Sequence, residues 1–202
     1  MPSTKEVILI TGGTSGLGLE TVKALHRSPN TYIILVGYYA ITPSQVESIL
    51  QTLRTTHPTS PSTLHPLPLD LESDTSLQSA IDLITREHGG KLDILINNAG
   101  ANFDEDVRHG RRPLRSALQK SWNVDLVGPH ILTTLSAPLL LASPSPRLIF
   151  ITSGTSSLTE TEVADFEKFP TLKVLNSSPP PGWPKAEGGV VACLGIGRRR
   201  RR

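Results

Sequence analysis

The sequence predicts an α/β protein built on an open, parallel β-sheet. Two observations carry this expectation. Short apolar, β-branched runs alternate with segments of helical periodicity, and a glycine-rich turn joins the first run to the first helix. Fully apolar strands separated by helices are typical of a parallel sheet that is covered on both faces, with right-handed crossovers. Five strands and four helices can be counted before Ser153.

The first unit is a strand, a turn and a helix. Residues Glu6–Thr11 form a short apolar run that leads directly into the glycine-rich segment Gly12–Gly18. The segment Leu19–Leu25 follows, with good helix formers and no proline. This order predicts a strand whose carboxyl end opens through a glycine turn into a helix.

The second unit repeats the pattern with a clearer helix start. Tyr32–Val36 is an apolar strand, and Thr42, Pro43 and Gln45 then match an N-cap, a first-turn proline and a capping-box glutamine. The residues behind them fall at i, i+3, i+4 and i+7 and predict one apolar helix face: Val46, Ile49, Leu50 and Leu53.

The remaining elements follow the same alternation. Thr63–Leu71 reads as a strand, part of which we expect to be irregular because it contains Pro66 and Pro68. Helical spacing recurs at Leu77, Ala80, Ile81 and Ile84, and further strands are expected at Leu92–Ile96 and Arg147–Thr152. Between these last two strands lies a long helical stretch, Leu114 to about Leu141, in which Pro129 and Pro138 should cause local kinks or ends.

The chain changes character after Ser153. Hydroxyl, acidic and proline-rich segments replace the alternation, and the sequence ends in five arginines, Arg198 to Arg202. We therefore expect one domain over residues 1–158 and an irregular, loop-rich tail over residues 159–202. The predicted sheet is incomplete at its C-terminal end.

Composition excludes several classes of function. Without the arginine run, 15 basic residues face 18 acidic ones, so the pI of 8.8 reflects the tail and predicts no nucleic-acid partner. No stretch reaches the roughly 18 uncharged apolar residues of a membrane span, so we expect no membrane partner and a cytoplasmic protein. Cys193 is the single cysteine and the six histidines lack the spacing of metal ligands, so no metal site is predicted.

A local basic group precedes the long helical stretch and suggests a solvated loop, with a phosphate or acidic-substrate contact as the alternative. Its members are Arg108, His109, Arg111, Arg112 and Arg115.

The glycine turn indicates a phosphate-binding site. Glycines permit positive φ and close backbone approach, and the free N–H groups of a helix start favour an anion. The spacing Gly12-xxx-Gly16-x-Gly18 differs from Gly-x-Gly-xx-Gly, and no Lys-Ser/Thr pair marks a P-loop. Dinucleotide binding is the functional interpretation, and an ordinary tight turn is the alternative.

Three motifs carry a family resemblance. The first is the glycine turn with Thr11 before it, the second is Asp70 after the third strand, and the third is Asn97-Asn98-Ala99-Gly100 after the fourth strand. In this order the motifs resemble the short-chain dehydrogenase/reductase family over about Lys5 to Ser153. The resemblance implies a doubly wound Rossmann sheet that binds NAD or NADP.

The same resemblance assigns cofactor-binding roles. It implies that the turn would line the pyrophosphate and ribose, that Asp70 would meet the adenine amino group with Leu71 beside it, and that the segment after the fourth strand would pass under the cofactor. The residues of the turn and of that segment are Gly12, Thr14, Ser15, Gly16, Leu17, Gly18, Asn98, Ala99 and Gly100. The position of Asp70 at a strand end agrees, and the alternative is a carboxylate at the start of the next helix. Gly37-Tyr38-Tyr39 offers neither an acid nor a base, so the choice between NAD and NADP stays open.

Family catalysis uses a serine, a tyrosine, a lysine and a supporting asparagine. By resemblance, Ser153 matches the serine, and Asp125 stands where the asparagine is expected. Asn123 lies two residues earlier, about 200° around an α-helix, so it cannot simply substitute. The Tyr-xxx-Lys pair is absent, since the only tyrosines are Tyr32, Tyr38 and Tyr39.

The sequence therefore predicts a C-terminally truncated or frame-altered family member. Its ancestral reaction would be NAD(P)-dependent oxidation or reduction of an alcohol/carbonyl pair, here impaired or lost. A small-molecule carbonyl or alcohol would be the partner if the chain is active, and a homo-oligomer is possible. The alternatives are a non-catalytic NAD(P)-binding regulatory protein and a non-functional remnant.

Overall fold

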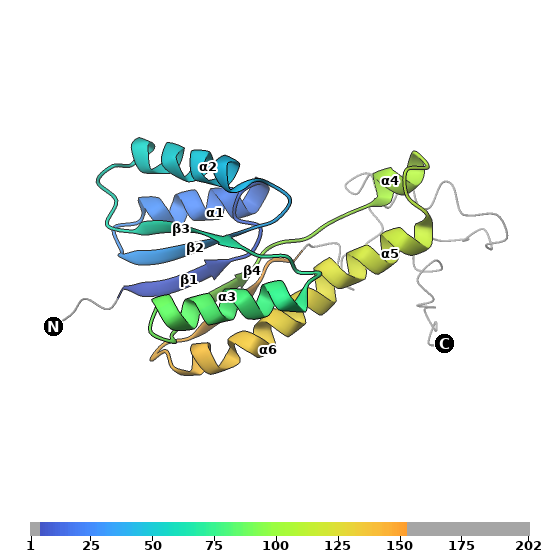
Figure 1. Ribbon diagram of the computed structural model, residues 1–202. Coiled ribbons are helices and arrows are strands. Elements are labelled where there is room, and N and C mark those ends of the chain that lie inside the picture. Colours follow the sequence, from blue (N-terminus) through green and yellow to red (C-terminus); the bar gives the residue numbers. More distant parts are fainter. Residues whose placement is uncertain (1–4, 153–202) are drawn as a thin grey trace, which may run out of the picture. The chain divides into compact units, whose positions relative to one another are not determined.

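The computed structural model of this 202-residue chain describes residues 5–152. The chain divides into two units, residues 1–151 and 152–202, and the description below concerns the first. Figure 1 shows it as one sheet with helices on both faces, which confirms the doubly wound α/β prediction.

The sheet has five parallel strands in the order β3-β2-β1-β4-β5. The strands are β1 (Glu6–Ile10), β2 (Tyr32–Tyr38), β3 (Thr63–Pro68), β4 (Ile94–Asn97) and β5 (Arg147–Phe150). Successive residues of β1 face opposite sides: Ile8 and Ile10 belong to one hydrophobic cluster, and Leu9 belongs to the other. Each strand of the centre is therefore buried on both faces, as its uniformly apolar sequence predicts.

The helices cover the two faces in pairs (Figure 1). On one side lie α1 (Gly16–Arg27) and α2 (Pro43–Thr56), and on the other lie α3 (Asp74–Glu87) and α6 (Gly128–Leu141). Three further segments complete the described fold: α4 (Asp104–Arg108), α5 (Leu114–Trp122) and the π-helical turn η1 (Asn123–Val127). The short α4 and the π-helical turn were not predicted from the sequence.

The predicted start of α2 is confirmed in detail. The Thr42 hydroxyl accepts the Gln45 N–H, the Gln45 side chain accepts the Thr42 N–H, and Pro43 occupies the first turn. In α3 the cap is Ser73, which accepts the Ser76 N–H. These capping contacts, reciprocal in α2 and one-sided in α3, satisfy N–H groups that have no partner inside the helix and so fix where each helix begins.

The prolines of β3 do not interrupt the strand, contrary to expectation. β3 pairs with β2 from Thr63 to Pro68 and ends there rather than at Leu71. Leu69 donates its N–H to Tyr38, so alternate N–H positions point toward β2 and the positions of Pro66 and Pro68 point to the open edge. An edge strand tolerates proline at such positions because no ladder hydrogen bond is lost.

The stretch Leu114–Leu141 is one continuous helix that passes through η1. By length and composition alone it could cross a membrane, although no membrane span was expected from the sequence. However, Leu132, Leu139 and Leu140 are buried in the hydrophobic core on the α3 side of the sheet, so α6 is a core helix. Pro129 follows the π turn directly, whereas Pro138 lies inside α6 without ending it.

A buried carboxylate joins the strands at the amino end of the sheet. Asp93 accepts the Val7 N–H at 2.8 Å, accepts the Ser143 hydroxyl and lies 3.0 Å from the Lys91 ammonium. Burial raises the pKa of Asp93, but these three partners outweigh it and hold the pKa below its ordinary value of 3.8. This end of the sheet is thus a structural polar network, opposite the end discussed next.

Candidate functional site

The carboxyl ends of β1 and β4 lie side by side at the centre of the sheet. After β1 the chain crosses to α1 on one face, and after β4 it leads toward α5 and α6, the last of which covers the other face (Figure 1). Such a reversal leaves a crevice beyond the strand ends, where open α/β sheets bind ligands. Most of the predicted site residues follow these two strands.

The glycine turn requires its glycines for different reasons. Gly12 and Gly16 have φ of +65° and +50°, a region that residues with a Cβ seldom adopt. Gly18 lies against the turn itself: a Cβ there would come within 2.2 Å of the Gly12 carbonyl oxygen and 2.5 Å of Asn98 Nδ2. The start of α1 can therefore pack this closely on the β1 end only with glycine at position 18.

The amino end of α1 has unpaired N–H groups. Its first backbone hydrogen bond runs from Leu19 to Ser15, and the Ser15 side chain makes no cap hydrogen bond. The N–H groups of Gly16, Leu17 and Gly18 precede this bond, so they lack intrahelical acceptors. Thr14 is half-buried while Leu17 is 72% exposed. This geometry suits an anion such as a phosphate.

Thr11 connects the two strand ends. Its hydroxyl accepts the N–H groups of Asn98 and Ala99 at 3.0 and 2.9 Å. In return, Asn98 Nδ2 donates to the Thr11 carbonyl at 2.8 Å and to the Gly12 carbonyl at 3.4 Å. The Asn98 side chain therefore holds the glycine turn against the segment after β4, which is a positioning role.

A pocket of about 280 Å³ opens beside this connection. Five of the predicted cofactor residues line it: Gly12, Asp70, Leu71, Ala99 and Gly100. The other lining residues were not among the predicted site residues, although the sequence had drawn attention to Thr11 and Tyr39. They are Thr11, Tyr39, Leu69, Glu72, Ala101, Phe103, Lys120 and Val124. The predicted residues Thr14, Ser15, Gly16, Leu17, Gly18 and Asn98 belong to the adjoining turn and strand connection rather than to the pocket lining.

Asp70 is not the cap of α3, although the sequence left that alternative open. Ser73 fills the cap position, and Asp70 Oδ1 instead accepts the Glu72 N–H at 2.9 Å. The Asp70 N–H donates to the Ser76 hydroxyl, which fixes the backbone beneath the pocket. The carboxylate therefore stands at the pocket wall, where it is able to accept a hydrogen bond from a ligand.

Asp125 lies in η1 and contacts the segment after β4. Its Oδ1 accepts the Ala101 N–H at 2.7 Å, and a Cβ on Gly100 would stand 3.4 Å from the same oxygen. Asp125 thus anchors the backbone that lines the pocket. Ser153, the other predicted catalytic residue, lies outside the described residues.

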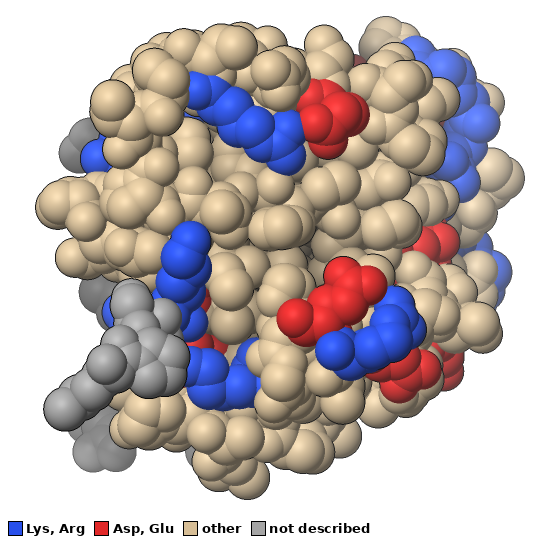
Figure 2. Space-filling model, turned by 60° about the vertical axis from the view of Figure 1, so that its left-hand side comes forward, with Lys and Arg blue, Asp and Glu red and all other residues tan. Residues whose placement is uncertain are grey.

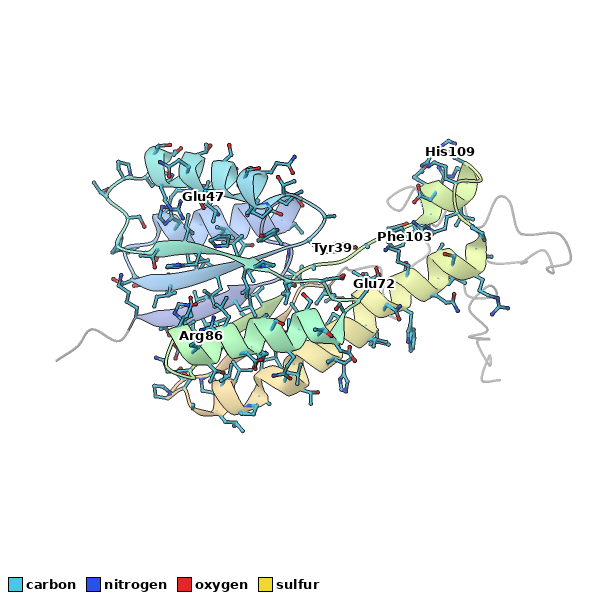
Figure 3. All side chains as sticks on the ribbon, viewed as in Figure 1. Tyr39, Glu47, Glu72, Arg86, Phe103 and His109 are labelled. Atoms are coloured by element: carbon cyan, nitrogen blue, oxygen red, sulfur yellow. The ribbon has the colours of Figure 1, made fainter. Side chains whose placement is uncertain are left out.

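The outer wall of the pocket is formed by groups from distant segments, among them Glu72 and Phe103 (Figure 3). Lys120 of α5 lies 2.6 Å from the Glu72 carboxylate, which raises the pKa of Lys120. The Lys120 ammonium and the Arg112 guanidinium lie over the Phe103 ring, 5.7 and 5.1 Å from its centroid. These cation–π contacts hold Phe103 between α5 and the pocket.

The basic group before α5 is balanced by the acids of α4. Arg108 and His109 contact Glu105, while Arg111 and Arg112 contact Asp106. Figure 2 shows acidic and basic side chains in small neighbouring groups over one face, separated by uncharged surface. This arrangement agrees with a solvated surface, but the segment is not the predicted loop throughout, because Arg108 lies in α4 and Arg115 lies in α5. Among residues 5–152, no three His, Cys, Asp or Glu side chains are placed to hold a metal ion.

The missed residues differ in how far the sequence could have shown them. Tyr39 follows β2, the strand end at which dinucleotide sites choose their cofactor, so its position was a usable signal. Phe103 and Lys120 give no comparable signal, because only the packing of α5 over the strand ends brings them to the pocket.

Comparison with known proteins gives one consistent result. The pattern of the short chain dehydrogenase family matches residues 6–165. The chain is 42% identical over 185 residues to the short-chain dehydrogenase/reductase eupG of a Phoma species, covering 91% of this chain and 63% of that protein. It is 37% identical to tropE of Talaromyces stipitatus, described in the same words, covering 92% and 64%. The chain therefore spans somewhat less than two thirds of the length of these relatives.

The fold comparison agrees. An NADH-dependent reductase, A1-R′, solved in complex with NAD, matches with a TM-score of 0.61 at 20% identity. The match covers 76% of this chain and 61% of that one. At this identity the likeness concerns the fold alone.

Proposed function

This chain belongs to the short-chain dehydrogenase family, a family of NAD(P)-dependent oxidoreductases, and we propose that it binds NAD or NADP beyond the ends of β1 and β4. The observation that carries the proposal is the joined pair of strand ends, where Thr11 and Asn98 hold the glycine turn beside a pocket. The reaction proposed is the family's interconversion of an alcohol and a carbonyl, impaired or lost in this chain.

The residues of the site fit a dinucleotide. The unpaired N–H groups at the start of α1 would hold the pyrophosphate, and Gly18 leaves no Cβ between them and the turn. Asp70, with Leu71 beside it, would meet the adenine in the pocket. Ala99 and Gly100 would pass under the cofactor, at the position that Asp125 fixes through Ala101.

The catalytic part of the proposal concerns a proton. A nicotinamide held at this site would supply or accept the hydride. The hydroxyl of Ser153 would polarise the substrate oxygen, and Asp125 would position the adjoining backbone rather than donate a proton. No Tyr-xxx-Lys pair occurs in the sequence, and loss of such a general acid commonly lowers rates by roughly 10²–10⁴-fold.

The second candidate is a protein that binds NAD(P) without turning it over and acts as a regulator. It is supported by the same observation together with the sequence, in which no Tyr-xxx-Lys pair supplies a proton donor. A non-functional remnant is the third possibility, and it predicts weak cofactor binding with a broad melting transition.

One titration distinguishes these candidates. NADH and NADPH are titrated into the 202-residue chain by nucleotide fluorescence, and carbonyl-dependent oxidation is then followed in the unmodified chain and in Ser153→Ala. Binding with turnover that Ser153→Ala abolishes supports the enzyme. Binding without turnover supports the regulator, and absence of binding refutes both.

The assembly and location are part of the same proposal. Three apolar side chains lie four residues apart on exposed α5, Leu114, Leu118 and Trp122, each 60–61% exposed. Such a row suits packing against the same helix of a second copy, so we infer a homo-oligomer. The proposed cofactor domain spans residues 1–158, with residues 159–202 as the tail, in a cytoplasmic protein that acts on a small-molecule carbonyl or alcohol.

A further inference from the structure

A buried histidine lies away from the candidate site, at the far end of α1. His26 occupies the last turn of this helix, and only 3% of the residue is exposed. Its ring Nδ1 lies 3.0 Å from the hydroxyl of Ser60, in the loop between α2 and β3. Within the described part of the chain, the other ring nitrogen, Nε2, is buried without a hydrogen-bond partner. A buried titratable side chain that is only half satisfied calls for an explanation.

The Ser60 hydroxyl fixes which ring nitrogen of His26 carries the proton. The hydroxyl donates its one proton to the His26 carbonyl oxygen, and its oxygen accepts the Ser62 N–H at 3.2 Å. A hydroxyl has one donor and two acceptor sites, so the remaining site accepts the proton of His26 Nδ1. Nε2 is then the bare nitrogen of a neutral ring. A second proton would create a charged N–H at Nε2, buried without an acceptor, which is costly.

The groups around the ring do not compensate for a positive charge. The His57 ring stands edge-on to the His26 ring, with the two centroids 6.4 Å apart. Besides His57, the charged group of the described chain that acts on His26 is Arg54 of α2, which is itself held by Glu47 and by the Leu64 carbonyl. Both neighbours are cations when protonated. Burial, and after it these two neighbours, hold the pKa of His26 below its ordinary value of 6.5.

Ser60 also begins a chain of hydrogen bonds that joins three connections of the fold. The Ser62 hydroxyl, just before β3, accepts the Tyr32 N–H at 3.0 Å and donates to the Asn30 carbonyl at 3.1 Å. Asn30 Nδ2 in turn donates to the Tyr32 hydroxyl at 2.7 Å. These contacts tie the end of α1 to the start of β2 and to the start of the edge strand β3. The histidine junction is defined here as His26, Asn30, Tyr32, Ser60 and Ser62.

We propose that the histidine junction is an acid-sensitive latch at the edge of the sheet, which neutral His26 keeps closed and protonated His26 opens. The charged ring is relieved of burial and of its cationic neighbours only when it moves into water. Ser60 then loses the Nδ1 donor, and the hydrogen bonds of Ser62 loosen with it. The latch is closed above pH 6.5 and weakens as the pH falls below 6.5, because the open chain binds a proton that the closed junction excludes. This inference does not depend on the proposed cofactor site.

Amide hydrogen exchange across pH tests the latch in the 202-residue chain. After correction for intrinsic exchange, the protection of the Ser62 and Tyr32 amides should be constant above pH 6.5. Below it, protection should fall by up to about tenfold per pH unit, the limit for uptake of one proton. The amide of Leu35 in the buried centre of β2 is the internal reference and should keep its protection. Constant protection of all three amides, or an equal fall in all three, would overturn the proposal.

A matched pair of variants assigns the effect to His26. His26→Asn keeps an amide N–H for Ser60 but has no group that takes up a proton. His130→Asn makes the same change at an exposed position of α6. The pH dependence of the Ser62 and Tyr32 amides should disappear in His26→Asn and persist in His130→Asn. Persistence in both variants would refute the role of His26.

A second measurement needs no variant and therefore covers one that folds poorly. The imidazole resonances of the unmodified chain are followed by NMR across pH. A titration midpoint of His26 below 6.5 supports the latch. A midpoint at or above 6.5 overturns it, and would indicate that the negative end of the α1 dipole stabilises the charged ring instead.

Discussion

The substitution Gly18→Ala tests whether the glycine turn and the strand connection form one rigid unit. The new Cβ would lie 2.2 Å from the Gly12 carbonyl oxygen and 2.5 Å from Asn98 Nδ2, so the backbone itself must move. Such overpacking costs about 1–3 kcal/mol, against a gain of up to about 1 kcal/mol from the better helix former. The expected net loss is about 1–2 kcal/mol.

The assay is a thermal melt together with a cofactor titration. For a chain of this size, about 1 kcal/mol corresponds to about 2–4 °C, so the melting temperature should fall by roughly 2–8 °C. Cofactor affinity should fall as well, because the displaced turn no longer presents the α1 N–H groups. Gly90→Ala is the control. Its φ of +68° strains a residue with a Cβ, so stability should fall, but the new Cβ would meet only Thr85 Cγ2 at 3.9 Å, far from the glycine turn, so cofactor affinity should not fall. Unchanged melting and affinity in Gly18→Ala would refute the reasoning.

Three further outcomes are expected. Hydrogen-bond and charge partners hold the pKa of Asp93 below 3.8, so the ionised carboxylate stabilises the fold fully above that pH and loses this effect as the pH falls through its folded-state pKa. Asp93→Asn should therefore be less stable than the unmodified chain near neutral pH. Urea unfolding across pH should show the difference in unfolding free energy vanish toward acid. Gly128→Ala would place a Cβ 2.3 Å from the Leu71 carbonyl oxygen and should lower the melting temperature by several degrees. Trp122→Glu should give a monomer by light scattering, whereas Gln119→Glu, at an exposed α5 position outside the apolar row, should not. Oligomers in both variants would contradict the α5 interface.

Local sequence signals predicted the framework of this fold. The capping box at Thr42 and Gln45 was visible because its partners are three residues apart, and the apolar strand runs were visible because parallel strands are buried on both faces. The end of β3 was missed because only the pairing with β2 shows which N–H positions of the strand face the open edge.

The sequence pointed to pocket residues only where they follow the end of a strand. Gly12, Asp70 and Ala99 follow strand ends and line the pocket. Lys120 and Phe103 reach the same pocket from segments whose own pattern shows a helix face and a loop. Lys120 contacts Phe103, 17 positions away, and Glu72, 48 positions away. A pattern within one helix or strand cannot indicate contacts over such separations.

The helix that runs from α5 through η1 to α6 explains why these distant residues converge. At η1 Asp125 accepts the N–H of Ala101, which fixes the segment after β4. One turn later Gly128 lies so close to the Leu71 carbonyl that a Cβ would stand 2.3 Å from it, which fixes the segment after β3. A π turn widens the helix locally, and such turns often occur at functional sites. Because one helix contacts the segments that form two walls of the pocket, a change in its register would move both, and the spacing between Asp125 and Gly128 sets the shape of the site.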